Sequence, residues 1–198
     1  MNRFLIIFIV SILLGALSGA VTSSIILNQR NSENNLIKDF YLTENAVSIS
    51  PHSLRVRMDQ GHDNYILVDL RSQEEYEKEH IIGAINIPVY KDKSTSDYNN
   101  KRIIEEFSKL PKEKEIIVYC YSMPCMSGRK IGKILAENDI YVKHLNIGWN
   151  EWRYYWGLWN HEYELNITNV TDYIAKGSEP GVPNLKNNTS SCAVDGGC

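Results

Sequence analysis

The sequence predicts an α/β domain with a central, mostly parallel sheet flanked by helices and preceded by one transmembrane helix. Three observations support this prediction: short apolar runs with the length of buried strands, amphipathic segments that alternate with them, and an uncharged apolar stretch near the N-terminus. Strands buried on both faces by neighbouring helices are continuously apolar, and alternation of strand and helix favours parallel pairing. With 198 residues, the chain has room for one such domain and two extensions.

The first element is the apolar stretch at residues 4–27, which carries no charged side chain. A helix of this length crosses the ~30 Å hydrocarbon core of a bilayer. A cleaved signal peptide is the alternative, with residues 18–20 as a small-residue cleavage site. The apolar run is longer than a signal peptide's and resumes at 25–27, so we expect a retained anchor at residues 1–28. Arg3 is the sole charged side chain before it, which favours an extracytoplasmic C-terminal domain.

Residues 29–45 are polar and rich in Asn, and they predict a linker between the anchor and a folded domain at 46–160. Within the domain, apolar runs mark strands and amphipathic or capped segments mark helices. The expected elements, in order, are a helix at 50–58, a strand at 65–71, a helix at 73–79, an apolar segment at 81–87, a loop at 90–100, a helix at 102–110, a strand at 116–119, a helix at 128–138 and a strand at 141–145.

The C-terminal part of the chain has two unusual features. All four tryptophans fall between residues 149 and 159, at spacings of three and four that predict one helical face. We expect this face to pack on the domain, with a belt at the membrane surface as the alternative. Residues 161–198 are polar and rich in Gly and Pro, so they predict a flexible tail, which carries Cys192 and Cys198.

Charge and cysteine content limit the possible functions. A net charge of −3 and a pI near 6.0 give no electrostatic reason to expect a nucleic-acid partner. The four cysteines form two close pairs, Cys120 with Cys125 and Cys192 with Cys198. Outside the cytoplasm such pairs are typical of structural disulfides, and equally of working dithiols. Both interpretations remain open at this point.

Cys120 follows a predicted strand and precedes a predicted helix, with Ser127 at the expected N-cap. Sites in open α/β sheets lie at the carboxyl ends of strands. The free N–H groups and the dipole at a helix N-terminus favour an anion, so we expect a lowered pKa and a nucleophilic thiolate at Cys120. A lone Cys after an apolar strand is more often a small core residue, but the strand, loop and helix context favours the reactive thiol.

Four separated stretches resemble those of the rhodanese-like domain family. They contain Asp69, Arg71 and the 74–76 segment of a D-x-R…E-x-[FY] pattern, the HIIGAINIP stretch at 80–88, the strand that ends in Cys120, and a closing segment at 146–152. They occur in the family's order and at ordinary spacing, over roughly residues 45–160. The resemblance implies a three-layer α/β fold, in which Asp69, Arg71 and His80 are structural residues.

The resemblance also implies sulfurtransferase activity. In this family a catalytic thiolate, here Cys120, attacks a sulfane sulfur in thiosulfate, polysulfide or a persulfide, and becomes a persulfide surrounded by loop N–H groups. A thiol acceptor or cyanide then takes the sulfur, so one transfer is split into two steps. No metal or organic cofactor is implied. The expected partners are therefore a small sulfur compound and a thiol acceptor, in addition to the membrane.

One position departs from the family pattern. Many members carry an Arg five residues after the Cys, where this chain has Cys125, and Arg129 comes nine residues after Cys120. The departure weakens the expectation of thiosulfate as donor, and the failed Cys-x5-Arg pattern argues against phosphatase chemistry. The expected substrate-binding residues are Ser122, Ser127, Gly128 and Arg129.

Cys125 is best interpreted as a second thiol. It would resolve a Cys120 persulfide or receive its sulfur, whereas a structural disulfide is the alternative. Two Cys side chains alone make too few ligands for a metal site. Two other functions also remain open: a dithiol/disulfide oxidoreductase or redox sensor, and a non-catalytic binding module, against which the retained Cys120 argues.

Overall fold

The structure is a computed structural model that describes residues 3–30, 32–90, 100–165 and 167–184. The chain divides into two compact units, residues 1–46 and 47–198, which are described separately. The expected loop at 90–100 falls largely on residues 91–99, and Cys192 and Cys198 fall on 185–198. Both therefore lie outside the described residues.

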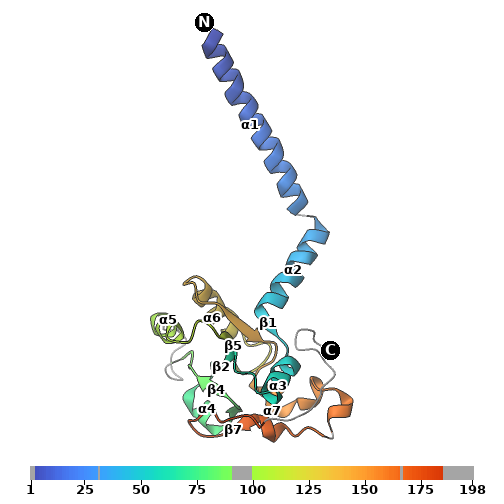
Figure 1. The fold of residues 1–198 in the computed structure, drawn as a ribbon, viewed down its shortest axis with the longest axis vertical. Helices are drawn as coiled ribbons and strands as arrows, with labels where there is room; N and C mark the ends of the chain where they lie inside the picture. The colour runs from blue at the N-terminus through green and yellow to red at the C-terminus, as the bar shows by residue number, and fades with distance from the viewer. Residues whose placement is uncertain (1–2, 31, 91–99, 166, 185–198) are drawn as a thin grey trace. The chain divides into compact units, whose positions relative to one another are not determined.

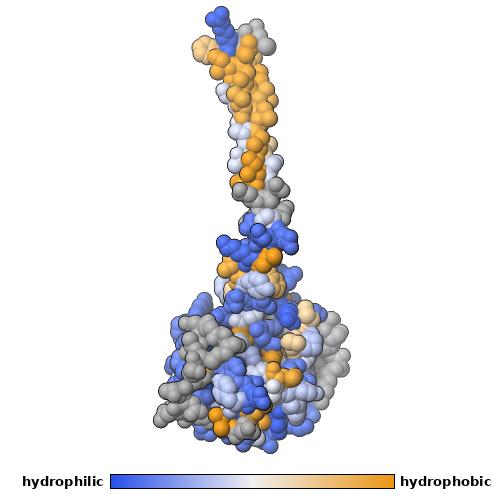
Figure 2. Space-filling model, turned by 90° about the vertical axis from the view of Figure 1, so that its right-hand side faces the viewer, coloured by the Kyte–Doolittle hydropathy of each residue, from blue (hydrophilic) through white to orange (hydrophobic). Residues whose placement is uncertain are grey.

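The first unit contains α1 (Arg3–Arg30) and all but the last residue of α2 (Glu33–Val47). The segment Arg3–Ile26 is long and apolar enough to cross a membrane, as a signal sequence near an N-terminus would also be. Figure 2 shows hydrophobic side chains over most of the visible face of α1. The expected linker at 29–45 is largely helical instead, because α2 continues through it to Val47.

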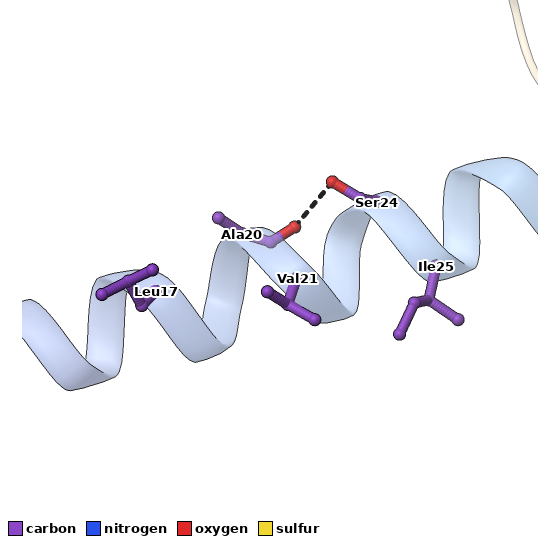
Figure 3. Close-up of a pocket in the computed structure, with 5 residues that line it drawn as sticks. All are labelled: Leu17, Ala20, Val21, Ser24 and Ile25. Carbon is purple, nitrogen blue, oxygen red and sulfur yellow. Dashed lines mark hydrogen bonds between the residues drawn. The ribbon is translucent and has the colours of Figure 1, made fainter.

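Four hydroxyl side chains of α1 hydrogen-bond to carbonyls of the helix itself. A shallow hollow on its surface is lined by Leu17, Ala20, Val21, Ser24 and Ile25. Figure 3 shows the Ser24 hydroxyl donating to the carbonyl of Ala20, at 2.9 Å. Ser11 and Thr22 likewise donate to carbonyls four residues earlier. Such back-bonding removes the cost of placing hydroxyls in an apolar environment, so the composition of α1 is compatible with a bilayer.

The second unit is built on a five-stranded sheet in which every pair is parallel, as predicted (Figure 1). Its strand order is β1-β6-β5-β2-β4. The bounds are β1 Ser48–Ile49, β6 Val142–Leu145, β5 Glu115–Tyr119, β2 Tyr65–Asp69 and β4 Ala84–Asn86. The apolar segment expected at 81–87 divides into β3 (His80–Ile81) and β4, because Gly83 makes a turn at φ 82°.

Helices cover both faces of this sheet. Alternation along β5 sends Ile117 and Tyr119 into a cluster with α3 (Pro51–Asp59), α4 (Gln73–Lys78) and α7 (Trp149–Tyr154). Ile116, Val118 and Cys120 point the other way, toward α5 (Asn100–Ser108) and α6 (Ser127–Ala136). The observed layers therefore confirm the predicted three-layer fold, and they place Cys120 on the α5 and α6 side.

Local capping explains where two helices begin. The Ser50 side chain accepts a hydrogen bond from the N–H of Ser53 at the start of α3. Ser72 and Glu75 form a capping box at the start of α4. Each cap satisfies N–H groups that have no partner inside the helix.

The tryptophans do not share one helical face, because α7 ends at Tyr154 and a 3-10 turn, η1 (Trp156–Leu158), follows. Trp152 stacks on Trp159 with ring centroids 4.8 Å apart, and Trp156 meets Trp159 edge-on at 4.5 Å. Trp152 is fully buried. Packing on the domain, rather than a membrane belt, therefore describes this cluster.

Residues 161–165 and 167–184 are not the loose tail that their composition predicts. Two 3-10 turns, η2 (Glu162–Glu164) and η3 (Val170–Tyr173), lead to β7 (Ile174–Ala175), which pairs antiparallel with β3. Tyr173 is 2% exposed and packs against Trp152 and Trp156. A few well-placed aromatic and apolar side chains thus dock a segment whose average composition is polar.

Candidate functional site

Cys120 and Cys125 come together at the carboxyl end of β5. Their sulfur atoms lie 2.8 Å apart, and both cysteines are free thiols. A turn between them is closed by the N–H of Cys125, which donates to the carbonyl of Ser122 at 3.0 Å. Cys120 is 7% exposed within the core cluster on the α5 and α6 side, while Cys125 is half-buried. The thiol loop, residues 120–126, therefore holds one buried and one accessible sulfur.

The start of α7 holds the thiol loop through its backbone. The N–H groups of Trp149 and Asn150 donate to the carbonyls of Cys120 and Tyr121, each at 2.8 Å. Gly148 is pressed so closely against the loop that an added Cβ would lie 2.1 Å from the backbone nitrogen of Ser122. A side chain therefore does not fit at position 148 without moving the loop.

Glu151 completes this attachment. Its carboxylate oxygen Oε2 accepts from the N–H of Met123 at 3.1 Å and from the N–H of Gly148 at 2.9 Å. Sequence reasoning missed Glu151 and Gly148 as loop-positioning residues. The spacing of a Gly at the N-cap and a Glu three positions later is the signal that would have found them.

The two thiols differ in acidity, in the direction opposite to the expectation for Cys120. Burial raises the pKa of the Cys120 thiol well above its usual range, and the adjacent Cys125 raises it further. Burial also acts to raise the pKa of Cys125, but hydrogen bonds from Cys120 and Ser127 outweigh it and lower that pKa below its usual value. Of the two thiols, Cys125 therefore loses its proton more readily, because the loop leaves this sulfur less buried and surrounds it with donors.

Ser127 and Gly128 open helix α6 beside the sulfur atoms. Met126, rather than Ser127, is the N-cap, and it makes no side-chain cap bond. This frees the buried Ser127 hydroxyl to hydrogen-bond both sulfur atoms. Gly128 allows α6 to approach β6 closely, because an added Cβ would lie 3.0 Å from His144 Nδ1.

In the described part of the chain, the hydrogen bonds of Arg129 and Ser122 go to loop residues and not to the sulfur atoms. The exposed Arg129 guanidinium donates from Nη1 to the carbonyl of Met123 at 3.4 Å and lies 3.9 Å from the Met126 sulfur. Ser122 contributes its carbonyl to the turn and its backbone to the contact with Gly148. Arg129 therefore places a positive charge at the loop mouth.

Asp69 and Arg71 form a buried network at the end of β2. Asp69 accepts from Arg71 Nη2 at 2.6 Å and from the Tyr119 hydroxyl at 2.6 Å. Arg71 also donates to the carbonyl of Glu79 at 2.8 Å, and its guanidinium lies 4.4 Å from the centroid of the Trp149 ring. These contacts hold the guanidinium of Arg71 between Asp69 and the Trp149 ring, and they tie the end of β2 to the start of α7.

His80 is fully buried and stacks on Tyr76 with ring centroids 3.8 Å apart. Its Nδ1 lies 2.8 Å from the Tyr76 carbonyl, which fixes the proton on that nitrogen. This arrangement belongs to the framework around α4 and not to the thiol loop.

The rim of the thiol loop is largely apolar. Tyr121, Met123 and Met126 are 38%, 58% and 52% exposed. The Tyr121 hydroxyl donates to the Glu75 carboxylate, and this hydrogen bond holds the Tyr121 ring in place at the rim. A partner that approaches the thiols therefore meets two Met side chains, a Tyr ring and the Arg129 charge.

The comparisons with known proteins agree with this architecture. Residues 50–154, just over half of the chain, match the sequence profile of the rhodanese-like domain. The chain is 32% identical over 87 residues to an HTH-type transcriptional regulator of Mycobacterium tuberculosis; the match covers 44% of this chain and 34% of that protein. The chain thus spans about a third of the length of this curated relative.

The chain also resembles solved structures. The crystal structure of the BH2092 protein from Bacillus halodurans has a TM-score of 0.51 and 24% identity, and covers 69% of this chain and 100% of that one. A full-length protein from Lactobacillus plantarum has a TM-score of 0.49 and 18% identity, with 61% and 92% covered. The first likeness supports the fold alone. The profile match over more than half of the chain shows that this chain belongs to the rhodanese-like domain family, and the parallel sheet with a Cys at the end of its central strand agrees with it.

Proposed function

We propose that this protein is a sulfurtransferase that moves sulfane sulfur through a persulfide on Cys120, with Cys125 as its second thiol. The observation that carries this proposal is the contact of two free thiols at the carboxyl end of the central parallel strand, 2.8 Å apart. The Tyr121 N–H and the Ser127 hydroxyl hydrogen-bond the Cys120 sulfur and favour a negative charge there.

Sulfur uptake begins with a proton transfer inside the pair. The Cys125 thiolate accepts the proton of Cys120, and the Cys120 thiolate attacks the outer sulfur of the donor. The donor's sulfur–sulfur bond breaks, and its electron pair leaves with the remaining fragment, which is sulfite for thiosulfate and a shortened chain for polysulfide. The product is a Cys120 persulfide anion beside a protonated Cys125.

The persulfide then has two routes. An external thiolate attacks its outer sulfur, takes that sulfur as a new persulfide, and releases the Cys120 thiolate. Alternatively, Cys125 attacks the Cys120 sulfur, which forms the Cys120–Cys125 disulfide and releases HS⁻. The second route oxidises the pair, so it requires an external dithiol to restore both thiols before the next turnover.

The surroundings of the loop favour polysulfide or an organic persulfide as donor over thiosulfate. Arg71, which lies near the loop, is committed to Asp69, and Met123 N–H is committed to the Glu151 carboxylate. Arg129 supplies a positive charge, but at the exposed mouth. The apolar rim of Met123 and Met126 is better suited to a donor with apolar or polarisable groups.

Intact mass spectrometry tests this function. Reduced full-length Cys125→Ser protein, in which internal release as HS⁻ is blocked, gains one sulfur atom after incubation with polysulfide. Digestion places this sulfur on a peptide that contains Cys120, and a small thiol acceptor removes it. A Cys125→Ser protein that gains no sulfur from polysulfide, thiosulfate or an organic persulfide, while it remains folded, contradicts the proposal.

A dithiol/disulfide oxidoreductase on the same fold is the second candidate. It is favoured by the lowered pKa of Cys125, since an accessible thiolate beside a second thiol is the arrangement that thiol–disulfide exchange uses. Exchange with a model disulfide at a useful rate, without any uptake of sulfane sulfur, distinguishes this function from sulfur transfer.

We further propose that α1 is a retained anchor and that the rhodanese-like domain lies outside the cytoplasm. The length of the apolar segment, Arg3–Ile26, and the sole charged side chain before its apolar run, Arg3, support this. N-terminal sequencing of protein extracted from membranes should find Met1 or Asn2. A mature chain that begins at Val21 in the soluble fraction would instead identify a signal peptide.

A further inference from the structure

Two histidines and a glutamate converge on the side of the domain where α3 meets η2. His52 lies in the first turn of α3, His161 precedes η2, and Glu164 ends it. One ligand atom from each of the three lies within 4.8 Å of the others, and His52 Nε2 is 3.5 Å from Glu164 Oε1. His52 and Glu164 are 8% and 6% exposed, and His161 is half-buried. The cluster shares no residue with the thiol loop.

A second observation concerns His52 itself. Its Nε2 atom is buried and makes no hydrogen bond of acceptable geometry within the described part of the chain, although it faces Glu164. A buried ring nitrogen without a partner costs free energy, and proteins normally provide one. An ion bound between the two histidines and the glutamate would give this nitrogen its partner.

We propose that His52, His161 and Glu164 bind a zinc ion. Two imidazoles and one carboxylate are ligands that Zn²⁺ accepts, and three protein ligands leave a fourth position for water. Mg²⁺ and Ca²⁺ require a shell of oxygen atoms that this donor set does not supply. His161 is half-buried, so the cluster is not sealed from solvent.

Arg55 has two opposing effects on zinc binding at this cluster. Its guanidinium binds Glu164 Oε1 and Asn160 Oδ1, which fixes the carboxylate but places a positive charge nearby. The second carboxylate oxygen of Glu164 accepts from the N–H of His161 at 3.0 Å. Zinc must therefore share Glu164 with Arg55, and this lowers its affinity.

The expected consequence is a clamp between two segments distant in sequence. His52 belongs to the first helix after β1, whereas His161 and Glu164 belong to the polar segment that follows the tryptophans. Zinc that binds the folded domain but not the unfolded chain stabilises this docking by mass action. This inference does not rest on the proposed sulfur chemistry.

Zinc titration of the full-length protein in detergent tests the proposal. All four cysteines are replaced by Ser, so that no thiolate competes for the ion, and Zn²⁺ is titrated against a chromophoric chelator. We expect one equivalent of zinc per chain and a raised melting temperature. His52→Ala and His161→Ala should each weaken binding by about tenfold or more, since even partners outside the first ligand shell are worth that much. His62→Ala, at an exposed histidine outside the cluster, is the control and should bind normally.

The proposal is overturned if the cysteine-free protein takes up no stoichiometric zinc, or if His52→Ala and His161→Ala bind as tightly as His62→Ala. If circular dichroism shows that His52→Ala does not fold, the His161→Ala variant alone tests the proposal. The His161 side chain is only half-buried, so its loss should disturb the fold less. Cobalt provides a separate readout: the tetrahedral absorption bands of bound Co²⁺ should appear in the parent protein and be absent from His161→Ala.

Discussion

The ends of β2 and β5 lie side by side in the sheet, with Asp69 opposite Tyr119, yet they carry different chemistry. At the end of β2, Asp69 and Arg71 are 0% and 3% exposed, and each bonds the other. At the end of β5, Cys125 of the thiol pair is half-buried, and the apolar rim around the pair is exposed. The end of β2 is buried around an ion pair that stabilises the fold. The end of β5 leaves one thiol, Cys125, partly accessible to solvent.

The two strand ends are also connected. Arg71 lies over the ring of Trp149, and the N–H of Trp149 donates to the carbonyl of Cys120. The closed network thus supports the residue that holds the open loop. Damage to the network should therefore reduce stability first, whereas damage to the loop should reduce sulfur transfer first.

The largest effect on stability is expected from Asp69→Ala. The change leaves the buried Arg71 charge and the Tyr119 hydroxyl without their main partner, which costs about 3–5 kcal/mol in the free energy of unfolding. Chemical denaturation measures it. Glu137→Ala is the control, because it removes an exposed ion pair with Lys133 and should cost less than about 0.5 kcal/mol. Equal losses in the two variants would show that the network at β2 is not a stabilising one.

Gly148→Ala should have the next largest effect, and should act on the loop. The added Cβ would overlap the backbone of Ser122, so α7 and the thiol loop must move apart, at a cost of about 1–3 kcal/mol. Sulfur uptake should fall by more than the loss of folded protein explains. The matched control is Gly157→Ala, where a Cβ meets nothing within 4 Å. Normal uptake in Gly148→Ala would show that the loop geometry does not depend on α7.

Arg129→Ala should have the smallest effect on stability, within about 0.5 kcal/mol, because the side chain is exposed and makes only long contacts. Uptake from anionic thiosulfate should fall more than uptake from an organic persulfide without a second charge. Lys133→Ala, on the same helix and also exposed, controls for the loss of a charge. An equal fall for both donors would remove Arg129 from donor selection.

The sheet and helices could be predicted because their signals are local. The apolar runs that became β2, β5 and β6 and the amphipathic α5 and α6 need only periodicity to be recognised. The docking of residues 161–184 could not be predicted, since it rests on a few side chains such as Tyr173 that meet distant partners. The sequence predicts only a weak helical patch at 36–41 within the linker, because the segment is polar, whereas α2 runs from Glu33 to Val47.

The candidate site was predicted in part. Its thiols follow from the strand and helix around them, and the network of Asp69 and Arg71 follows from the family pattern. The acidity of the pair did not follow, because it depends on which sulfur is buried and which donors surround it. Glu151 and Gly148 were missed because their importance comes from contact with Met123 and Ser122, which are more than twenty residues away in sequence.

The most direct test of the central claim compares two single-cysteine variants by intact mass after polysulfide treatment. Cys120→Ser should gain no sulfur in this loop. Cys125→Ser should gain one sulfur atom and hold it longer than the wild type, because internal release as HS⁻ is lost, while the wild type accumulates the Cys120–Cys125 disulfide without a reductant. The Cys192→Ser/Cys198→Ser background keeps the tail thiols out of the comparison. Uptake by Cys120→Ser but not by Cys125→Ser would reverse the two roles, and unchanged sulfur transfer in both, with lower stability, would contradict the account.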